Sequence, residues 1–186
     1  MNASVPGAAD AFGAMARRFD LSVVAQGEPA KIAPEEVIVE GALFGSGRPV
    51  VVVPYIQKGG IKFERALVAW DASRSAARAV ADAMPFLAKA QAIDVVIVAS
   101  EQPKSDEVPG ADIGHHLARH GLKVEVKRIV ATDTDVANTL LSHAADTAAE
   151  LMVMGGYGHS RLREFVLGGA TRGILSAMTI PVLMSH

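Results

Sequence analysis

Short apolar runs alternate with longer amphipathic stretches from residue 62 to the end of the chain. The first run, Arg65–Trp70, is compact and apolar and predicts a strand. Asp71 and Ser73 follow it, and their side-chain oxygens can accept the free N–H groups at the start of a helix. The next residues form one apolar face at helical spacing, made by Ala76, Ala77, Val80, Met84 and Leu87. The pattern therefore predicts a strand followed by a capped amphipathic helix.

The next two apolar runs differ in a way that predicts their places in a sheet. Residues 93–100 form a nearly continuous β-branched run, which is typical of a strand buried on both faces. Residues 123–130 alternate charged and apolar side chains, which predicts a strand with one wet face near a sheet edge. Between these strands a short helix is expected around residues 112–120, and Gly121 is a typical residue to end it.

The last third of the chain continues the same alternation. Thr134 or Asp135 can cap a helix that runs to about Ala149, and residues 151–154 predict a fourth strand. A glycine-rich loop, a helix at 170–178 and a strand at 181–184 follow. Five strands alternating with four helices predict an α/β fold with a doubly wound, parallel five-stranded sheet of the Rossmann or flavodoxin type. The reason is that parallel strands need helical, right-handed crossovers.

The first sixty residues resemble a partial copy of the last third. Asp20–Val24 parallels Glu150–Met154, and Pro49–Val52 parallels Pro181–Met184, with the segment 34–43 where the last helix would be. We therefore predict a strand-helix-strand fragment over residues 1–59 and a complete domain over residues 60–186. The alternative is a chance similarity of two short apolar strands. Two strands and a helix cannot bury a core alone, so the fragment must pack on the complete domain or on another chain.

Composition removes several classes of protein. Half of the 186 residues are hydrophobic, which excludes a disordered chain. Because there is no cysteine, disulfide scaffolds, thiolate metal sites and cysteine nucleophiles are excluded. A net charge of -2 argues against a nucleic-acid partner. The sequence shows neither a leader peptide nor an apolar run long enough to span a membrane, so we expect a cytoplasmic protein.

The glycine-rich loop after the fourth strand has the chemistry of an anion cradle. Glycines let the backbone approach a ligand and expose its N–H groups, and the N-terminus of the following helix attracts negative charge. The spacing matches neither a Walker loop nor a dinucleotide fingerprint. In the partial copy, Ala25 and Glu28 stand where Gly155 and Gly158 stand in the complete domain. We therefore expect the complete domain, and not the copy, to bind phosphate.

Gly155, Gly158 and Gly168 form the pattern G-x2-G-x9-G. This pattern resembles the nucleotide-binding signature of the universal stress protein family, and so do the segments ALVAWDASRSAARAV and GGATRGILSAMTIPVLM. The likeness covers residues 64–186 as one domain and 12–54 as the tail of a degenerate preceding domain. The resemblance implies an adenine nucleotide alpha hydrolase-like fold in a tandem member of the family with an incomplete first domain.

The resemblance also implies a ligand, ATP or else AMP or ADP, with or without Mg²⁺. By this resemblance Asp71 and the backbone near Ala69 and Trp70 would receive the adenosine, and Val98 would pack at the adenine. The ribose and phosphates would be lined or held by Met154, Gly155, Gly158, Gly168, Gly169, Ala170 and Thr171. One position departs from the family pattern, since Gly169 stands where the family has Ser or Thr after its third glycine.

Three functional hypotheses are consistent with the sequence. The leading one is a stress-response module that senses or holds ATP without efficient catalysis, because no nucleophile-base-acid trio is found. The alternative is a dimerisation or scaffold protein of the same fold that binds no nucleotide. A nucleotide hydrolase ranks third. As partners we expect an adenine nucleotide and a second copy of the chain, in a dimer formed by pairing of the strands at 49–54 or 181–184, and neither nucleic acid nor membrane.

The histidines are weaker candidates for chemistry. Asp112, His116 and His120 fall on one helical face, which permits a metal, but His115 and the polar surroundings favour a solvated face and no metal site. His143 lies on the apolar side of its predicted helix and is interpreted as a packed or boundary residue.

Overall fold

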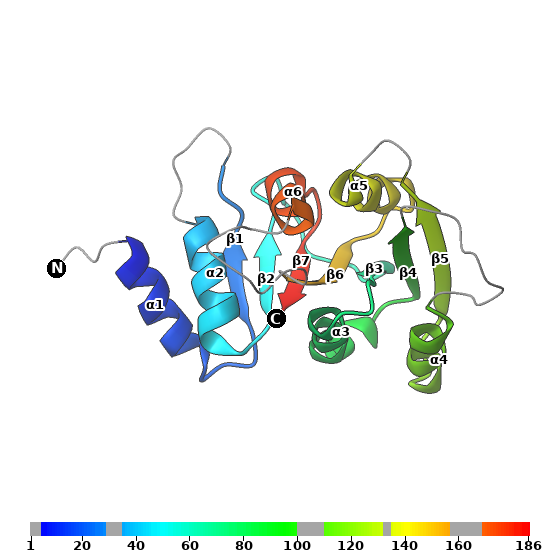
Figure 1. Cartoon of the computed structure of the whole chain (residues 1–186), viewed down its shortest axis with the longest axis horizontal. Coiled ribbons are helices and arrows are strands. Elements are labelled where there is room, and N and C mark those ends of the chain that lie inside the picture. The colour runs from blue at the N-terminus through cyan, green and yellow to red at the C-terminus, as the bar shows by residue number, and fades with distance from the viewer. Residues whose placement is uncertain (1–4, 29–34, 100–109, 132–134, 157–168) are drawn as a thin grey trace.

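The computed structural model describes residues 5–28, 35–99, 110–131, 135–156 and 169–186. Over these residues the chain forms one seven-stranded sheet with helices on both faces (Figure 1). The strand order is β1-β2-β7-β6-β3-β4-β5. The strands are β1 Ser22–Ala25, β2 Val50–Val53, β3 Arg65–Ala69, β4 Ala92–Ala99, β5 Val124–Val130, β6 Leu151–Gly155 and β7 Val182–Ser185.

The helices divide between the two faces of the sheet. Helices α3 (Arg74–Leu87) and α4 (Ala111–Arg119) pack on one face, in a core cluster with Ala66, Val68 and Val95. Helices α2 (Glu35–Ser46), α5 (Val136–Asp146) and α6 (Gly169–Ala177) pack on the other, around Leu67, Val96 and Met152. Helix α1 (Val5–Ala16) lies against α2 at the end of the molecule (Figure 1). The alternation of side chains along each strand supplies both cores.

The elements predicted after residue 62 are confirmed, with small shifts of their ends. The Ser73 hydroxyl accepts the N–H of Ala76 at 3.1 Å and caps α3. Of the two candidate caps for α5, Asp135 fills the position, since its carboxylate accepts the N–H of Asn138 at 2.7 Å. Gly121 takes a φ of +78° just after α4, as expected of a terminating glycine. β5 is an edge strand, as its alternating pattern predicts.

The first part of the chain contains one element that the pattern did not predict. Helix α1 has few large apolar residues, so its periodicity is weak. Small residues instead let α1 and α2 approach closely: a Cβ added to Gly41 would lie 2.7 Å from the carbonyl oxygen of Ala9. The first part is therefore helix-strand-helix-strand, one helix longer than the expected fragment.

The first part joins the rest of the chain through β2. Strand β2 pairs in parallel with β1 and antiparallel with β7, with Val51 opposite Leu183. The side chain of Gln26 adds a buried link, donating to the carbonyl oxygen of Leu175 at 2.8 Å. The prediction that 49–54 or 181–184 would pair between two copies of the chain is wrong. Each of these strands already has two neighbours within one chain, because β2 completes the edge that β7 would otherwise expose.

The strand pair β1 and β2 has the same parallel register as the strand pair β6 and β7. In β1 and β2, Ser22 is opposite Val50, and in β6 and β7, Met152 is opposite Val182. These are corresponding positions in the two matching stretches of sequence. The antiparallel register between β2 and β7 is also symmetric about its central pair, Val51 and Leu183. A local two-fold rotation about this pair therefore relates β2 to β7 and β1 to β6.

Within the part of the chain that the structure describes, none of the helices has the length and apolar character required to cross a membrane.

Candidate functional site

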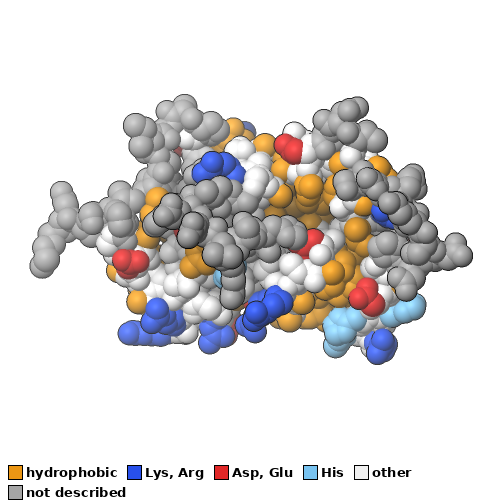
Figure 2. Space-filling view, viewed as in Figure 1, with side chains coloured by type: hydrophobic (Ala, Val, Ile, Leu, Met, Phe, Trp, Pro, Cys, Tyr) orange, Lys and Arg blue, Asp and Glu red, His pale blue; other side chains and the backbone are white. Residues whose placement is uncertain are grey.

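A pocket opens at the carboxyl ends of β3, β4 and β6, where α5 and α6 begin. The chain winds from β3 to β4 on one side, and β6 lies on the other, so this is the switch point at which ligands bind in doubly wound sheets. Figure 2 shows hydrophobic side chains gathered between α5 and α6. The pocket is lined by Ala69, Trp70, Asp71, Val96, Val98, Val136, Leu140, Met154, Gly155, Gly169, Ala170 and Thr171.

Every predicted site residue that the structure describes lines this pocket. Two predicted residues, Gly158 and Gly168, lie outside the described residues. Sequence reasoning missed three apolar lining residues. Val96 lies two residues before Val98 and therefore on the same face of the strand, so its place could have been inferred from that of Val98. Val136 and Leu140 are one helical turn apart on α5, and their place depends on how α5 packs across β4.

The pocket has a volume of about 170 Å³. This is slightly more than the roughly 150 Å³ of an apolar cavity that binds a benzene ring. Its valine, leucine and methionine side chains therefore leave room for one planar ring at the apolar end.

The turn from β3 into α3 fixes the position of Asp71. The Asp71 carboxylate accepts the N–H of Ser73 at 2.9 Å, and Ala72 between them takes a φ of +59°. Asp71 is exposed at the pocket wall. The side chain of Trp70 packs with the core cluster under α3 and α4, on the opposite face from α5. Trp70 therefore reaches the pocket without its bulk filling the space beneath α5.

Gly155 and Gly169 differ in whether their surroundings leave room for a side chain. A Cβ added to Gly155 would lie 2.6 Å from both the backbone nitrogen of Ala76 and the hydroxyl oxygen of Ser75. Glycine is therefore needed for β6 to end beside the start of α3. A Cβ added to Gly169 would meet nothing within 4 Å. The missing side chain at Gly169 thus reflects no steric need within the described residues.

The start of α6 faces the pocket through Gly169, Ala170 and Thr171. The first N–H groups of a helix lack intrahelical partners and carry the positive end of the helix dipole. Asp71 is the one ionisable residue among the described lining residues. The pocket therefore combines an apolar wall, a carboxylate and a helix N-terminus, an arrangement that suits a ligand with a ring and an anionic group.

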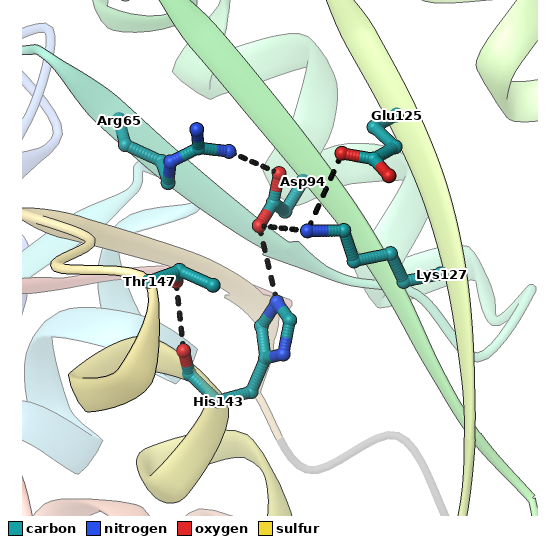
Figure 3. A network of polar contacts seen from close by, with 6 residues as sticks. All are labelled: Arg65, Asp94, Glu125, Lys127, His143 and Thr147. Atoms are coloured by element: carbon teal, nitrogen blue, oxygen red, sulfur yellow. Dashed lines mark hydrogen bonds and ion pairs between the residues drawn. The ribbon is translucent and has the colours of Figure 1, made fainter.

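A second polar constellation lies on the same face of the sheet, at the other end of β4 (Figure 3). The buried Asp94 carboxylate accepts hydrogen bonds from Arg65 at 2.6 Å, Lys127 at 3.0 Å and His143 at 3.1 Å. Glu125 lies 3.3 Å from the Lys127 ammonium. Sequence reasoning did not connect these residues, which come from β3, β4, β5 and α5.

This network shifts two pKa values. Burial by itself raises the pKa of Asp94, but hydrogen bonds from Lys127 and His143, with the charges of Lys127 and Arg65, lower it below the usual value. Burial tends to lower the pKa of Lys127, and its hydrogen bond and charge pairing with Asp94 raise that pKa above the usual value. Asp94 is therefore held as a carboxylate and Lys127 as an ammonium at neutral pH.

His116 of α4 and His120, which caps the end of that helix, form a ring contact. The centroids of His116 and His120 are 5.0 Å apart in an edge-to-face arrangement. The Asp112 carboxylate accepts the N–H of Ile113 at 2.8 Å. Among the described residues there is no group of three His, Cys, Asp or Glu side chains placed to hold a metal ion.

Comparison with known proteins identifies the family. The model of the universal stress protein family matches residues 62–186, about two thirds of the chain. The chain belongs to the universal stress protein family. A curated relative, universal stress protein Slr1230 of Synechocystis sp., is 28% identical over 174 residues, which is 89% of this chain and 57% of that protein. This chain thus spans little more than half the length of that relative.

Two solved universal stress protein structures share the fold over nearly the whole chain. One from Archaeoglobus fulgidus has a TM-score of 0.68 at 20% identity and covers 91% of this chain and 63% of its own. A putative universal stress protein from Pseudomonas aeruginosa has a TM-score of 0.63 at 15% identity, covering 98% of this chain and 68% of its own. The mostly parallel sheet described above is therefore a universal stress protein fold, Rossmann-like and of the adenine nucleotide alpha hydrolase-like type.

Proposed function

We propose that this universal stress protein binds ATP, or another adenine nucleotide, and holds it without efficient turnover. The observation that carries the proposal is the pocket at the switch point, where all the predicted site residues within the described part of the chain converge. Because ATP is a cytoplasmic metabolite, the proposal also assigns the protein to the cytoplasm.

The chemistry of the lining fits the two ends of an adenine nucleotide. Val96, Val98 and Leu140 offer an apolar wall to the base, and the Asp71 carboxylate can accept hydrogen bonds from ribose hydroxyls. The N–H groups at the start of α6 suit the phosphates. With Asp71 as the one carboxylate among the described lining residues, Mg²⁺ would be held chiefly by the phosphates and water.

Calorimetric titration with ATP, ADP, AMP and GTP tests the proposal. We expect binding of the adenine nucleotides and a rise in thermal stability, about 2.7 kcal/mol at a hundredfold excess over Kd. Val136→Glu changes an exposed lining residue and should weaken ATP binding by charge repulsion. The absence of both heat and thermal shift at millimolar ATP would refute the proposal. Steady release of ADP, abolished by Asp71→Ala, would instead favour a hydrolase.

The alternative of a scaffold protein without nucleotide is favoured by one residue, Gly169. The family pattern has a hydroxyl side chain at this position, and glycine supplies only its backbone N–H to a phosphate. A scaffold predicts that ATP and Val136→Glu both leave the protein's self-association unchanged.

We further propose that residues 1–59 are a degenerate copy of the domain's last third and bind no nucleotide. The order α1-β1-α2-β2 repeats α5-β6-α6-β7, and the parallel registers coincide. Ala25 and Glu28 replace two site glycines, and a glutamate at position 28 would repel a phosphate. Deleting residues 1–59 would therefore cost stability, through loss of β2 beside β7, and not nucleotide contacts.

We propose a homodimer through β1, the edge strand of the partial copy. Val23 is 62% exposed, whereas its counterpart Val153 is 0% exposed beneath α3. An edge strand with an exposed valine is a template for pairing with a second chain. Sedimentation should show a dimer that Val23→Lys converts to a monomer. The same change at another exposed valine, Val136→Lys, should leave the dimer intact, and a monomeric wild-type protein would refute the proposal.

A further inference from the structure

Helix α5 meets β4 along a single seam that contains both the pocket wall and part of the Asp94 network. Three alternating residues of β4 face α5: Asp94, Val96 and Val98. Three residues of α5 at helical spacing meet them: Val136, Leu140 and His143. The valines and leucine line the pocket at one end of the seam, and the His143–Asp94 hydrogen bond lies at the other.

Asp94 does not need His143 to balance its charge. The Arg65 guanidinium and the Lys127 ammonium both pair with the carboxylate, at 2.6 Å and 3.0 Å. Because an ionised carboxylate only accepts hydrogen bonds, Nε2 of His143 carries the proton of the third bond. What this third bond adds is a directional link between the sheet and the helix that forms the pocket wall (Figure 3).

Apolar contacts also hold α5 within the described part of the chain, and these are less directional. Leu140 and Ala144 are buried in the core cluster on this face of the sheet. Ala137 touches α6, where a Cβ added to Gly173 would lie 2.6 Å from the Ala137 Cβ. Apolar packing permits small sliding movements, and a slip of one residue along the helix axis is about 1.5 Å. Such a slip would move Val136 and Leu140 relative to Val96 and Val98.

We infer that His143 is a positioning residue for the nucleotide pocket: its hydrogen bond to Asp94 fixes α5 on β4 and so places Val136 and Leu140. The inference rests on the proposed function. Residues that act through a neighbouring element in this way change ligand affinity without touching the ligand, by about two- to thirtyfold.

The test compares two changes at His143 in the full chain. His143→Leu removes the hydrogen bond, whereas His143→Gln keeps an N–H donor at a similar reach. Ser142→Ala, on the exposed face of α5, is the matched control. We expect His143→Leu to weaken ATP binding roughly fivefold and to speed amide hydrogen exchange in α5 relative to α4. His143→Gln should restore most of both, and Ser142→Ala should change neither.

The outcomes separate this inference from the proposed function. If the wild-type protein binds ATP, Val136→Glu weakens binding and His143→Leu does not, the positioning role is refuted and the function stands. A lower melting temperature for His143→Leu, with unchanged affinity and unchanged exchange in α5, also refutes it. If the wild-type protein binds no ATP, the proposed function is refuted, and so is the expected effect of His143→Leu on ATP affinity. Amide hydrogen exchange in α5 then decides whether His143 anchors this helix. Unchanged exchange rates in His143→Leu refute the anchoring. Faster exchange in His143→Leu that returns to the wild-type rate in His143→Gln supports it.

Discussion

Val51 of β2 lies opposite Leu183 of β7, at the centre of the antiparallel ladder that joins the first part of the chain to the family domain. Leu183 is 0% exposed and Val51 is 7% exposed, and both belong to the core cluster beneath α3. The core therefore continues across the junction. A continuous core of this kind favours unfolding of both parts together.

Leu183→Ala should test this coupling. Removing a buried leucine side chain costs about 2–5 kcal/mol of unfolding free energy. We expect urea denaturation followed by circular dichroism to give a single transition at a lower midpoint. Thr179→Ala, at an exposed position before the same strand, should have little effect. Two separate transitions in the wild-type protein would show that the first part unfolds independently.

Asp94→Asn should alter how stability depends on pH. The pKa of Asp94 is lowered in the folded protein from about 3.9 in unfolded chains, so the folded state binds this proton less tightly. The carboxylate therefore stabilises the fold above about pH 4, and its contribution is lost as the pH falls through the folded-state pKa.

At pH 7 we expect Asp94→Asn to lower the unfolding free energy by about 3 kcal/mol, because it leaves Lys127 and Arg65 without their buried partner. The difference from wild type should shrink in acid, where the protonated Asp94 resembles asparagine. Urea titrations between pH 3 and 8 measure this difference in unfolding free energy. A difference that stays constant over this range would contradict the prediction.

Gly169→Ser should strengthen ATP binding. A Cβ added at this position would meet nothing within 4 Å among the described residues, so the change should be tolerated. The new hydroxyl could donate to a phosphate, and hydrogen bonds to charged groups contribute about 1.5–3 kcal/mol. We expect roughly tenfold tighter binding by calorimetry. The variant Gly169→Ala distinguishes the effect of the hydroxyl on affinity from the effect of the added carbon atom. Equal gains in ATP affinity from both variants would count against a phosphate contact.

Gly155→Ala should damage both the fold and the pocket. The added methyl group would lie 2.6 Å from the Ala76 backbone nitrogen, a contact that requires β6 or α3 to move. Overpacking of this kind costs about 1–3 kcal/mol. We expect a lower melting temperature and weaker ATP binding. Unchanged values of both would mean that the start of α3 moves freely away from β6.

The sequence was informative where a local rule determines the structure. Helix caps at Ser73 and Asp135, the terminating Gly121 and the alternation of β5 all involve neighbours in the chain, and each was confirmed. The site residues on β3, β4 and β6 converged because parallel strands end at a common edge of the sheet. Val98 and Met154 entered the prediction only through the resemblance to the family.

The sequence was less informative where distant elements meet. Helix α1 is held by close approach of small residues to α2, which leaves little hydrophobic periodicity. The pairing of β2 with β7 within the chain depends on which free edge is nearest, and apolar runs alone do not specify a partner. In the Asp94 network the carboxylate bonds to residues that are 29 to 49 positions away in the sequence, a distance over which no spacing rule applies.

The place of β7 in the sheet also bears on how the protein is made. Strand β7 follows β2, β3, β4, β5 and β6 in the sequence, yet it lies between β2 and β6 and is the link through which the first part joins the sheet. During synthesis β1 and β2 leave the ribosome before β7 and must wait for it. The valine-rich β2 is exposed for that whole interval, when unpaired strands are prone to aggregate. The sheet thus closes only after β7 has been made, and chaperones that shield β2 would raise the yield of folded protein.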